Sequence, residues 1–187
     1  MAIDYRPLGK SYLDSSEWPA LMEKSEGWVG VPYDDGKQIA TIGIGVNLKE
    51  RGYLALVLQK LGVFAANDAY EADRRQANNL PPETIAEKNT RYNTVINDFM
   101  AVINSKTLSR TTQKPGESAS EIALQIALNV KLKKPEYLGP YSTKTFFLTE
   151  IEAYDVKSAI VLGFTIGPIT DREPEGSDRN IQQGTKR

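Results

Sequence analysis

Acid–base side chains lie at defined spacings between residues 26 and 45. Glu26 stands before Gly27, Asp35 follows nine residues after Glu26, and Thr41 follows six residues after Asp35. A carboxylic acid can donate a proton to a leaving group, and a second carboxylate can accept a proton or balance positive charge. A threonine hydroxyl can donate and accept hydrogen bonds without acting as a base. These residue types can therefore supply the acid and the base of one reaction.

The surrounding sequence predicts how each carboxyl group is tuned. A predicted helix ends at Glu26, and the negative end of its dipole raises the pKa of the Glu26 carboxyl. Asp35 lies in a predicted turn at residues 34–36, where its carboxylate is expected to stay ionised. Adjacent side chains of an extended segment point to opposite faces. We therefore expect one of Asp34 and Asp35 to face the site and the other to face solvent, with Tyr33 on the same face as Asp35.

Two missing residue types narrow the chemistry. The 187 residues contain no cysteine and no histidine, which excludes thiol nucleophiles, iron–sulfur clusters, Ser-His-Asp hydrolysis and histidine-bound zinc. Acid–base work then falls mainly to carboxylates. With 23 basic and 24 acidic residues the net charge is −1, which argues against a protein that coats nucleic acid. We expect no metal ion and no organic cofactor.

The residue pattern predicts an α+β fold. Gly, Val, Ile and Tyr residues predict short antiparallel strands within residues 28–47, and most of the remaining pattern is helical. We expect a small sheet lobe, a mostly helical lobe and a cleft between them. A single domain is predicted over residues 1–187, with a lead-in at 1–15 and a polar tail at 167–187. In Thr41–Gly45 two glycines alternate with isoleucines, so another group is expected to approach this backbone closely.

The helical part is predicted in successive segments. One segment follows Leu48 and ends at Gly62, and Asn67 is expected to cap the next. The last apolar helices are expected between residues 142 and 164. After a break at residues 81–82, a long helix is predicted with six residues facing inward: Ile85, Tyr92, Val95, Ile96, Phe99 and Ile103. A further helix over residues 117–130 is predicted from its apolar residues Ile122, Ala123, Ile126, Ala127 and Val130.

Residues 22–48 resemble the phage-type muramidases, the T-even phage lysozyme group of glycoside hydrolase family 24. That family has Glu-Gly, then Tyr-x-Asp ending nine residues after the Glu, then Thr-Ile-Gly-x-Gly beginning six residues after the Asp. The matching segments here are Glu26-Gly27, Tyr33-Asp34-Asp35 and Thr41–Gly45. The resemblance implies a lysozyme-like fold and hydrolysis, with inversion, of the β-1,4 bond between N-acetylmuramic acid and N-acetylglucosamine in peptidoglycan.

The same resemblance implies roles for individual residues. The catalytic positions fall on Glu26, Asp35 and Thr41, with water entering between Asp35 and Thr41. The spacing of the family selects Asp35 rather than Asp34, so Asp34 is expected to face solvent. Residues 127–130 resemble the family's Phe-Asn-x-Gly and place Asn129 at the substrate. The positions assigned to substrate binding are Tyr33, Gly43, Asn47 and Asn129.

A nearby variant of the pattern concerns position 47. Residues 45–48 read Gly-Val-Asn-Leu and resemble the Gly-Val-Asp-Leu of pesticin-like bacteriocin muramidases, whose working Asp lies six residues after the Thr. Position 47 is Asn here. The side chain that works together with Glu26 is therefore either Asp35, as in the phage-type pattern, or the residue at position 47, as in the bacteriocin pattern. Val46 and Lys131 stand where the phage-type pattern often has His and Gly. The divergent helical half and the missing signal-peptide pattern suit an antibacterial effector or toxin domain at least as well as a phage endolysin.

Partners and location follow from the implied activity. The expected partner is the glycan strand of peptidoglycan, joined by an immunity protein if the chain is an effector. We expect no nucleic-acid partner and no membrane insertion, because the longest apolar stretch, residues 159–164, is far too short to span a bilayer. The N-terminus lacks a signal-peptide pattern. Delivery to the periplasm or cell wall by a secretion system, a larger toxin or a phage holin is therefore expected.

Two other functions compete with hydrolysis. An inactive lysozyme-like module would bind peptidoglycan without releasing reducing ends. A lytic transglycosylase leaves 1,6-anhydro ends and needs only the acid, so the presence of Asp35 together with Thr41 argues against it.

Overall fold

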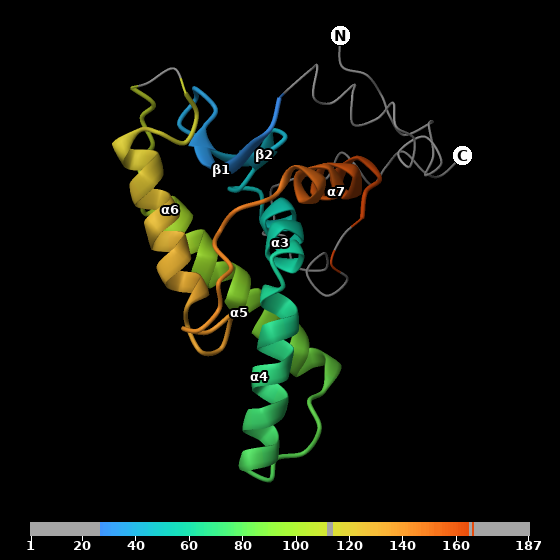
Figure 1. The fold of residues 1–187 in the computed structure, drawn as a ribbon. Coiled ribbons are helices and arrows are strands. Elements are labelled where there is room, and N and C mark those ends of the chain that lie inside the picture. Colours follow the sequence, from blue (N-terminus) through green and yellow to red (C-terminus); the bar gives the residue numbers. More distant parts are fainter. Residues whose placement is uncertain (1–26, 112–113, 165, 167–187) are drawn as a thin grey trace, which may run out of the picture.

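The computed structural model describes residues 27–111, 114–164 and 166, and it combines a small sheet with helices (Figure 1). The strands are β1 (Val29–Asp34), β2 (Ala40–Gly43) and β3 (Val46–Asn47). The helices of this part of the chain are α3 (Arg51–Lys60), α4 (Val63–Ala77), α5 (Ile85–Asn104), α6 (Ala119–Leu132) and α7 (Glu150–Val161). The prediction of a mixed fold is confirmed, and within the described ranges the strands all lie in residues 28–47. A lysozyme-like arrangement and the predicted cleft stay predictions.

The sheet is a meander in the order β1-β2-β3, with antiparallel neighbours. Along β1 the burial alternates, and the even-numbered residues are buried while the odd-numbered ones are half-buried. All of β2 is buried. One face of the sheet therefore packs in the hydrophobic core. The sheet contributes Ala40, Ile42 and Val46 to that core.

Two glycines explain the turn that follows β2. Gly45 has φ 62°, a left-handed conformation that suits glycine, in the tight turn between β2 and β3. Gly43 has φ 63°, and a Cβ on it would lie 3.1 Å from the Cβ of Ala153 in α7. The predicted close approach is confirmed, and the approaching group is a helix of the same chain.

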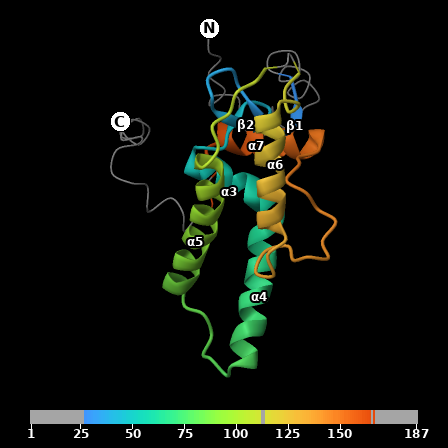
Figure 2. The same cartoon turned by 90° about the vertical axis from the view of Figure 1, so that its left-hand side faces the viewer.

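The first helices follow the predicted breaks, with one correction. α3 ends at Lys60, and Gly62 at φ 82° is the N-cap residue before α4. Asn67 is not a cap, because it lies buried inside α4, where its amide donates to the Glu136 carbonyl (2.8 Å). Figures 1 and 2 show α4 carrying the chain away from the sheet and α5 returning toward it.

Helix α5 begins with a capping box in which Thr84 accepts from the Glu87 N–H and the Glu87 side chain accepts from the Thr84 N–H. Five of its six predicted inward residues are buried. The exception is Ile85, which is 80% exposed because it lies in the first turn, at the end of α5 far from the sheet. The segment predicted to carry the last helices is helical only over α7, which begins after the capping residue Thr149.

Helix α6 forms where the sequence predicts it, but most of the apolar residues from which it was predicted do not pack in the hydrophobic core. Ile122, Ile126 and Val130 are exposed, whereas Leu124, Leu128 and Leu132 are buried. α6 thus carries two apolar stripes. The leucine stripe faces the hydrophobic core, to which α5 also contributes.

The sheet is joined to α6 by a buried carboxylate. Glu121 is fully buried, and its Oε1 accepts the backbone N–H of Asp34 (2.7 Å). Its Oε2 accepts the N–H groups of Gly116 (3.0 Å) and Ser118 (2.9 Å). A buried carboxylate is tolerable only when such donors replace water. The end of β1 is thereby fixed to the first turn of α6.

The described residues contain no helix that is long and apolar enough to cross a membrane. The helix predicted to end at Glu26 lies outside the described residues. Gly27 itself has φ 70°, the conformation expected of a glycine that follows a helix end.

The buried carboxylate gives a stability prediction. Glu121→Ala leaves three backbone N–H groups without their acceptor, and each costs about 1–3 kcal/mol when buried. We expect the free energy of unfolding to fall by about 3 kcal/mol, measured by urea denaturation. The control is Glu117→Ala, an exposed position beside the same helix end, with an expected change within about 0.5 kcal/mol. Equal effects of the two variants would contradict this role of Glu121.

Candidate functional site

Three of the predicted site residues lie in one row across the sheet. Tyr33 of β1 is paired with Thr41 of β2, and Thr41 is paired with Asn47 of β3. Directly opposed residues of antiparallel strands carry their side chains on the same face. The structure therefore brings Tyr33, Thr41 and Asn47 together, with Thr41 in the middle.

The Thr41 hydroxyl is held in one orientation. Thr41 is buried, and its Oγ1 donates a hydrogen bond to the Ile39 carbonyl (3.2 Å). A hydroxyl that donates its single proton keeps its lone pairs for accepting. Thr41 can therefore accept a hydrogen bond from a water molecule.

Asp35 lies in the turn between β1 and β2 and is exposed. Its Oδ1 accepts the N–H groups of Lys37 (2.7 Å) and Ile39 (3.3 Å). Among the described residues no hydrogen bond reaches Oδ2. The carboxylate is thus anchored by one oxygen, and the other is available to water or a ligand. The backbone of Ile39 binds both candidate side chains, its N–H to Asp35 and its carbonyl to Thr41.

The expectation for Asp34 is wrong, because Asp34 is buried rather than solvent-facing. Its Oδ1 accepts the N–H groups of Gly36 (3.0 Å) and Gln38 (2.8 Å), and its Oδ2 accepts the N–H of Arg110 (3.3 Å). The two adjacent aspartates do face different environments, as alternation requires. The buried side is the core side of the sheet, where Asp34 organises the turn and the loop before α6.

Lys49 is a neighbour that the sequence did not single out. Its backbone N–H donates to Asn47 Oδ1 (2.8 Å), and its ammonium group donates to the Gln38 carbonyl (3.2 Å). An exposed cation therefore lies between the end of β3 and the turn that carries Asp35. In the sequence Lys49 is one lysine in a polar stretch, and no pattern distinguishes it from an ordinary surface lysine.

Two predicted substrate-binding residues are used elsewhere. The side that a Gly43 side chain would occupy is taken by Ala153, as described above. Asn129 of α6 accepts the N–H of Phe146 at its Oδ1 (2.7 Å) and so holds the segment before α7. The contacts given for these two residues are with Ala153 and Phe146. Their substrate-binding roles stay predictions without structural support.

The predicted acid, Glu26, lies outside the described residues. The neighbouring backbone is described from Gly27, and Val29 at the start of β1 is paired with Gly43 at the end of β2. The chain therefore enters the sheet beside the end of the strand that carries Thr41.

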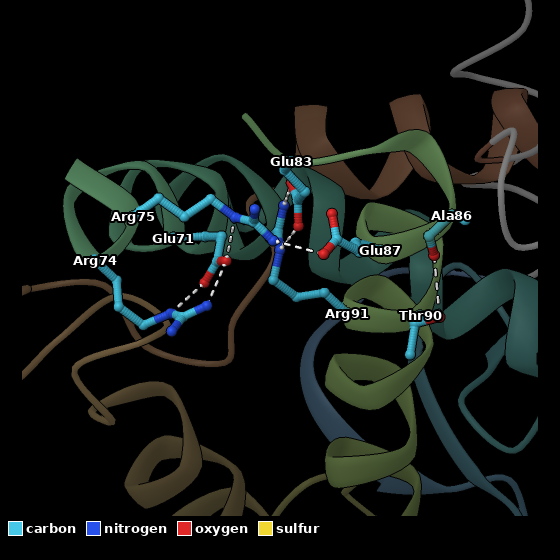
Figure 3. Close-up of a pocket in the computed structure, with 8 residues that line it drawn as sticks. All are labelled: Glu71, Arg74, Arg75, Glu83, Ala86, Glu87, Thr90 and Arg91. Carbon is cyan, nitrogen blue, oxygen red and sulfur yellow. Dashed lines mark hydrogen bonds and ion pairs between the residues drawn. The ribbon is translucent and has the colours of Figure 1, made fainter. Parts of the chain in front are cut away.

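A separate cavity of about 400 Å³ lies between α4 and α5 (Figure 3). Charged side chains of both signs dominate its lining, which consists of Glu71, Arg74, Arg75, Glu83, Ala86, Glu87, Thr90 and Arg91. Figure 3 shows Arg74 and Arg75 both directed at Glu71, at distances of 2.7–2.8 Å. Arg91 binds Glu83 and Asp68 (2.7 Å each).

These contacts give the cavity a structural function. The arginines are engaged with carboxylates of the same two helices and of the loop that joins them, and Arg75 also donates to the Pro81 carbonyl (2.8 Å). The hydrogen bond from Arg74, followed by that from Arg75, lowers the pKa of Glu71 to about 2 despite its burial. The network holds the corner between α4 and α5.

Among the described residues no group of three or more His, Cys, Asp or Glu side chains is arranged to hold a metal ion.

The α4–α5 corner predicts an acid-dependent loss of stability. Glu71 titrates near 4.5 when unfolded and near 2 when folded, so its contribution is complete above pH 4.5 and is lost as the pH falls toward 2. We expect the melting temperature of the wild type to fall more steeply over that window than that of Glu71→Gln. Thermal unfolding followed by circular dichroism measures this. Parallel curves for the two proteins would count against the pairing.

Comparison of the chain with family models, with curated proteins and with solved structures finds no match.

Proposed function

We propose that the chain is a peptidoglycan N-acetylmuramidase that cleaves the β-1,4 bond between N-acetylmuramic acid and N-acetylglucosamine with inversion. The observation that carries the proposal is the link through Ile39, whose backbone binds Asp35 on one side (3.3 Å) and Thr41 on the other (3.2 Å). The spacing of Glu26, Asp35 and Thr41 supports it independently.

In the proposed reaction a water molecule is held between the free Oδ2 of Asp35 and the lone pairs of Thr41 Oγ1. The water oxygen attacks the anomeric carbon on the face opposite the leaving sugar, and Asp35 takes the proton. Glu26 donates a proton to the glycosidic oxygen as that bond breaks. Inverting enzymes separate their carboxyl groups by roughly 6.5–9.5 Å so that the water fits between them.

The half-buried neighbours of Thr41 suit contacts with the sugar. Tyr33 and Asn47 flank Thr41 in the row and offer a ring and an amide. Lys49 places a positive charge at the same edge, which suits the carboxylate of a muramic acid lactyl group. Asn47 takes the place of the bacteriocin aspartate, and a neutral amide cannot act as the base. Asp35 is therefore the proposed base.

The biological setting proposed is attack on the bacterial cell wall, by an effector or toxin domain or by an endolysin. An effector would have an immunity protein as partner. The competing function is an inactive module that binds peptidoglycan, and a lytic transglycosylase is the second alternative. Mass spectrometry of peptidoglycan digested by the purified chain separates these functions. Reducing muramic acid ends support hydrolysis, intact strands support the binding module, and 1,6-anhydro ends support the transglycosylase.

Substitution of the carboxylates tests the assignment of roles. Glu26→Gln and Asp35→Asn should each lower the rate of reducing-end release by on the order of 10²–10⁴-fold, because an amide neither donates an acidic proton nor activates water. The matched control is Asp73→Asn, which makes the same charge change at an exposed position of α4. A folded Asp35→Asn variant with wild-type turnover would refute Asp35 as the base.

Thr41→Val separates the water-binding role from a structural one. Valine has nearly the same volume and a higher β-strand preference, but it cannot accept a hydrogen bond from water. We expect a fall in turnover of at least tenfold, while the free energy of unfolding changes by about 1 kcal/mol or less, since one hydrogen bond to Ile39 is lost. Turnover assays and urea denaturation on the same preparation measure both. Loss of stability without loss of turnover would assign Thr41 to the fold alone.

A further inference from the structure

Helix α6 exposes an apolar stripe along its whole length. Ile122, Ile126 and Val130 are 44%, 58% and 67% exposed. Ala119 and Ala123 are exposed beside them, and Ala127 is half-buried. These six residues, the α6 stripe, recur at the three- and four-residue spacing of one helix face. Figure 2 shows α6 toward the viewer, with no other described helix or strand over it.

The pattern of the α6 stripe is complementary to itself. Large and small side chains alternate, and a second α6 laid antiparallel about the midpoint between residues 124 and 125 pairs each large residue with an alanine. Ile122 then faces Ala127, Ala123 faces Ile126, and Ala119 faces Val130 of the second copy. Alanine opposite a branched side chain lets two helices approach closely without voids or overlap. A parallel pair has no such register, because it places like residues opposite one another.

Charge also favours the antiparallel pair. Between residues 118 and 130 the sole charged residue is Glu121, which is buried. Glu117 precedes the helix, and Lys133 follows it with its ammonium group on the carbonyls of Ser142 and Lys144 rather than on a carboxylate. An antiparallel partner brings Glu117 of one copy toward Lys133 of the other and opposes the two helix dipoles.

From these observations we propose that the α6 stripe is the interface of a homodimer, in which two copies of this chain pack α6 against α6 in antiparallel orientation. The stripe is about 17 Å long, from the rise of about 1.5 Å per residue. A single helix pair of that length buries less than the roughly 800 Å² per partner of a standard interface. The dimer is therefore weak, with a dissociation constant in the micromolar range. The proposal does not depend on the proposed enzymatic activity.

The first test is the mass of the full-length chain as a function of concentration. Sedimentation velocity from about 1 to 200 μM, a range that brackets micromolar affinity, should show a shift from one chain to two.

Ile126→Asp should raise the dissociation constant at least 50-fold, because it places a charge near the two-fold axis. The matched control is Ile85→Asp, which alters an isoleucine that is 80% exposed in α5 and should leave the dissociation constant unchanged. A single-chain mass at every concentration overturns the proposal and leaves the stripe to another protein. A dimer that Ile126→Asp does not weaken overturns it as well.

The second test does not depend on the folding of the aspartate variant. The chain contains no cysteine, so introduced thiols are the sole source of disulfides. A mixture of Ala123→Cys and Ile126→Cys chains, whose altered positions face each other in the proposed pair, should form a mixed disulfide dimer under mild oxidation. A mixture of Ile85→Cys and Ile126→Cys chains should form at least tenfold less. Equal yields from the two mixtures would refute the α6 pairing.

Discussion

The fully buried carboxylate of Glu121 is the constraint on which the arrangement of sheet and helices depends. Its oxygens need hydrogen-bond donors in the core, and they obtain them from the backbone of Asp34, Gly116 and Ser118. Those three residues belong to the end of β1, the loop before α6 and the cap of α6. One side chain thus fixes how the strand, the loop and the helix meet. Displacement of any of the three segments would leave buried charge or buried N–H groups unsatisfied.

The conformation of the β1–β2 turn follows from that attachment. Once the end of β1 is fixed at Asp34, its carboxylate binds the N–H groups of Gly36, Gln38 and Arg110. On the exposed side, the Asp35 carboxylate accepts hydrogen bonds from the N–H groups of Lys37 and Ile39, which alternate along the turn with those bound by Asp34. The turn is therefore closed by two successive carboxylates, and the second of them has one oxygen that no hydrogen bond from the described part of the chain reaches. This difference in environment separates an aspartate that builds the fold from one that is available for chemistry.

Helix α6 shows how one sequence can serve two surfaces. Its leucine stripe completes the core with α5 and β1, and Glu121 lies on that same side. The isoleucine and alanine stripe is then left on the outside, although its residues are as apolar as those inside. The choice between the stripes follows from Glu121, because a helix rotated to bury the isoleucines would expose the carboxylate and break its three hydrogen bonds. An apolar outer face is the consequence, and in the proposed homodimer a second copy of α6 covers it.

Local pattern in the sequence was enough to locate most elements. Alternation and turn residues placed the strands within residues 28–47, Gly62 and the pair at residues 81–82 marked the helix breaks, and the inward residues of α5 followed from their spacing apart from Ile85. The spacing of Glu26, Asp35 and Thr41 identified a candidate site, and strand pairing places Thr41 of that site between Tyr33 and Asn47. Local sequence determines these features because backbone preferences and side-chain periodicity act over a few residues.

The tertiary structure alone decided which of two adjacent aspartates is buried, which stripe of α6 faces the core, and that Asn67 binds inside a helix instead of capping one. Each of these depends on a partner distant in the chain, Glu121 for Asp34 and Glu136 for Asn67, and no local pattern specifies which distant group will supply a buried polar atom with its hydrogen bond.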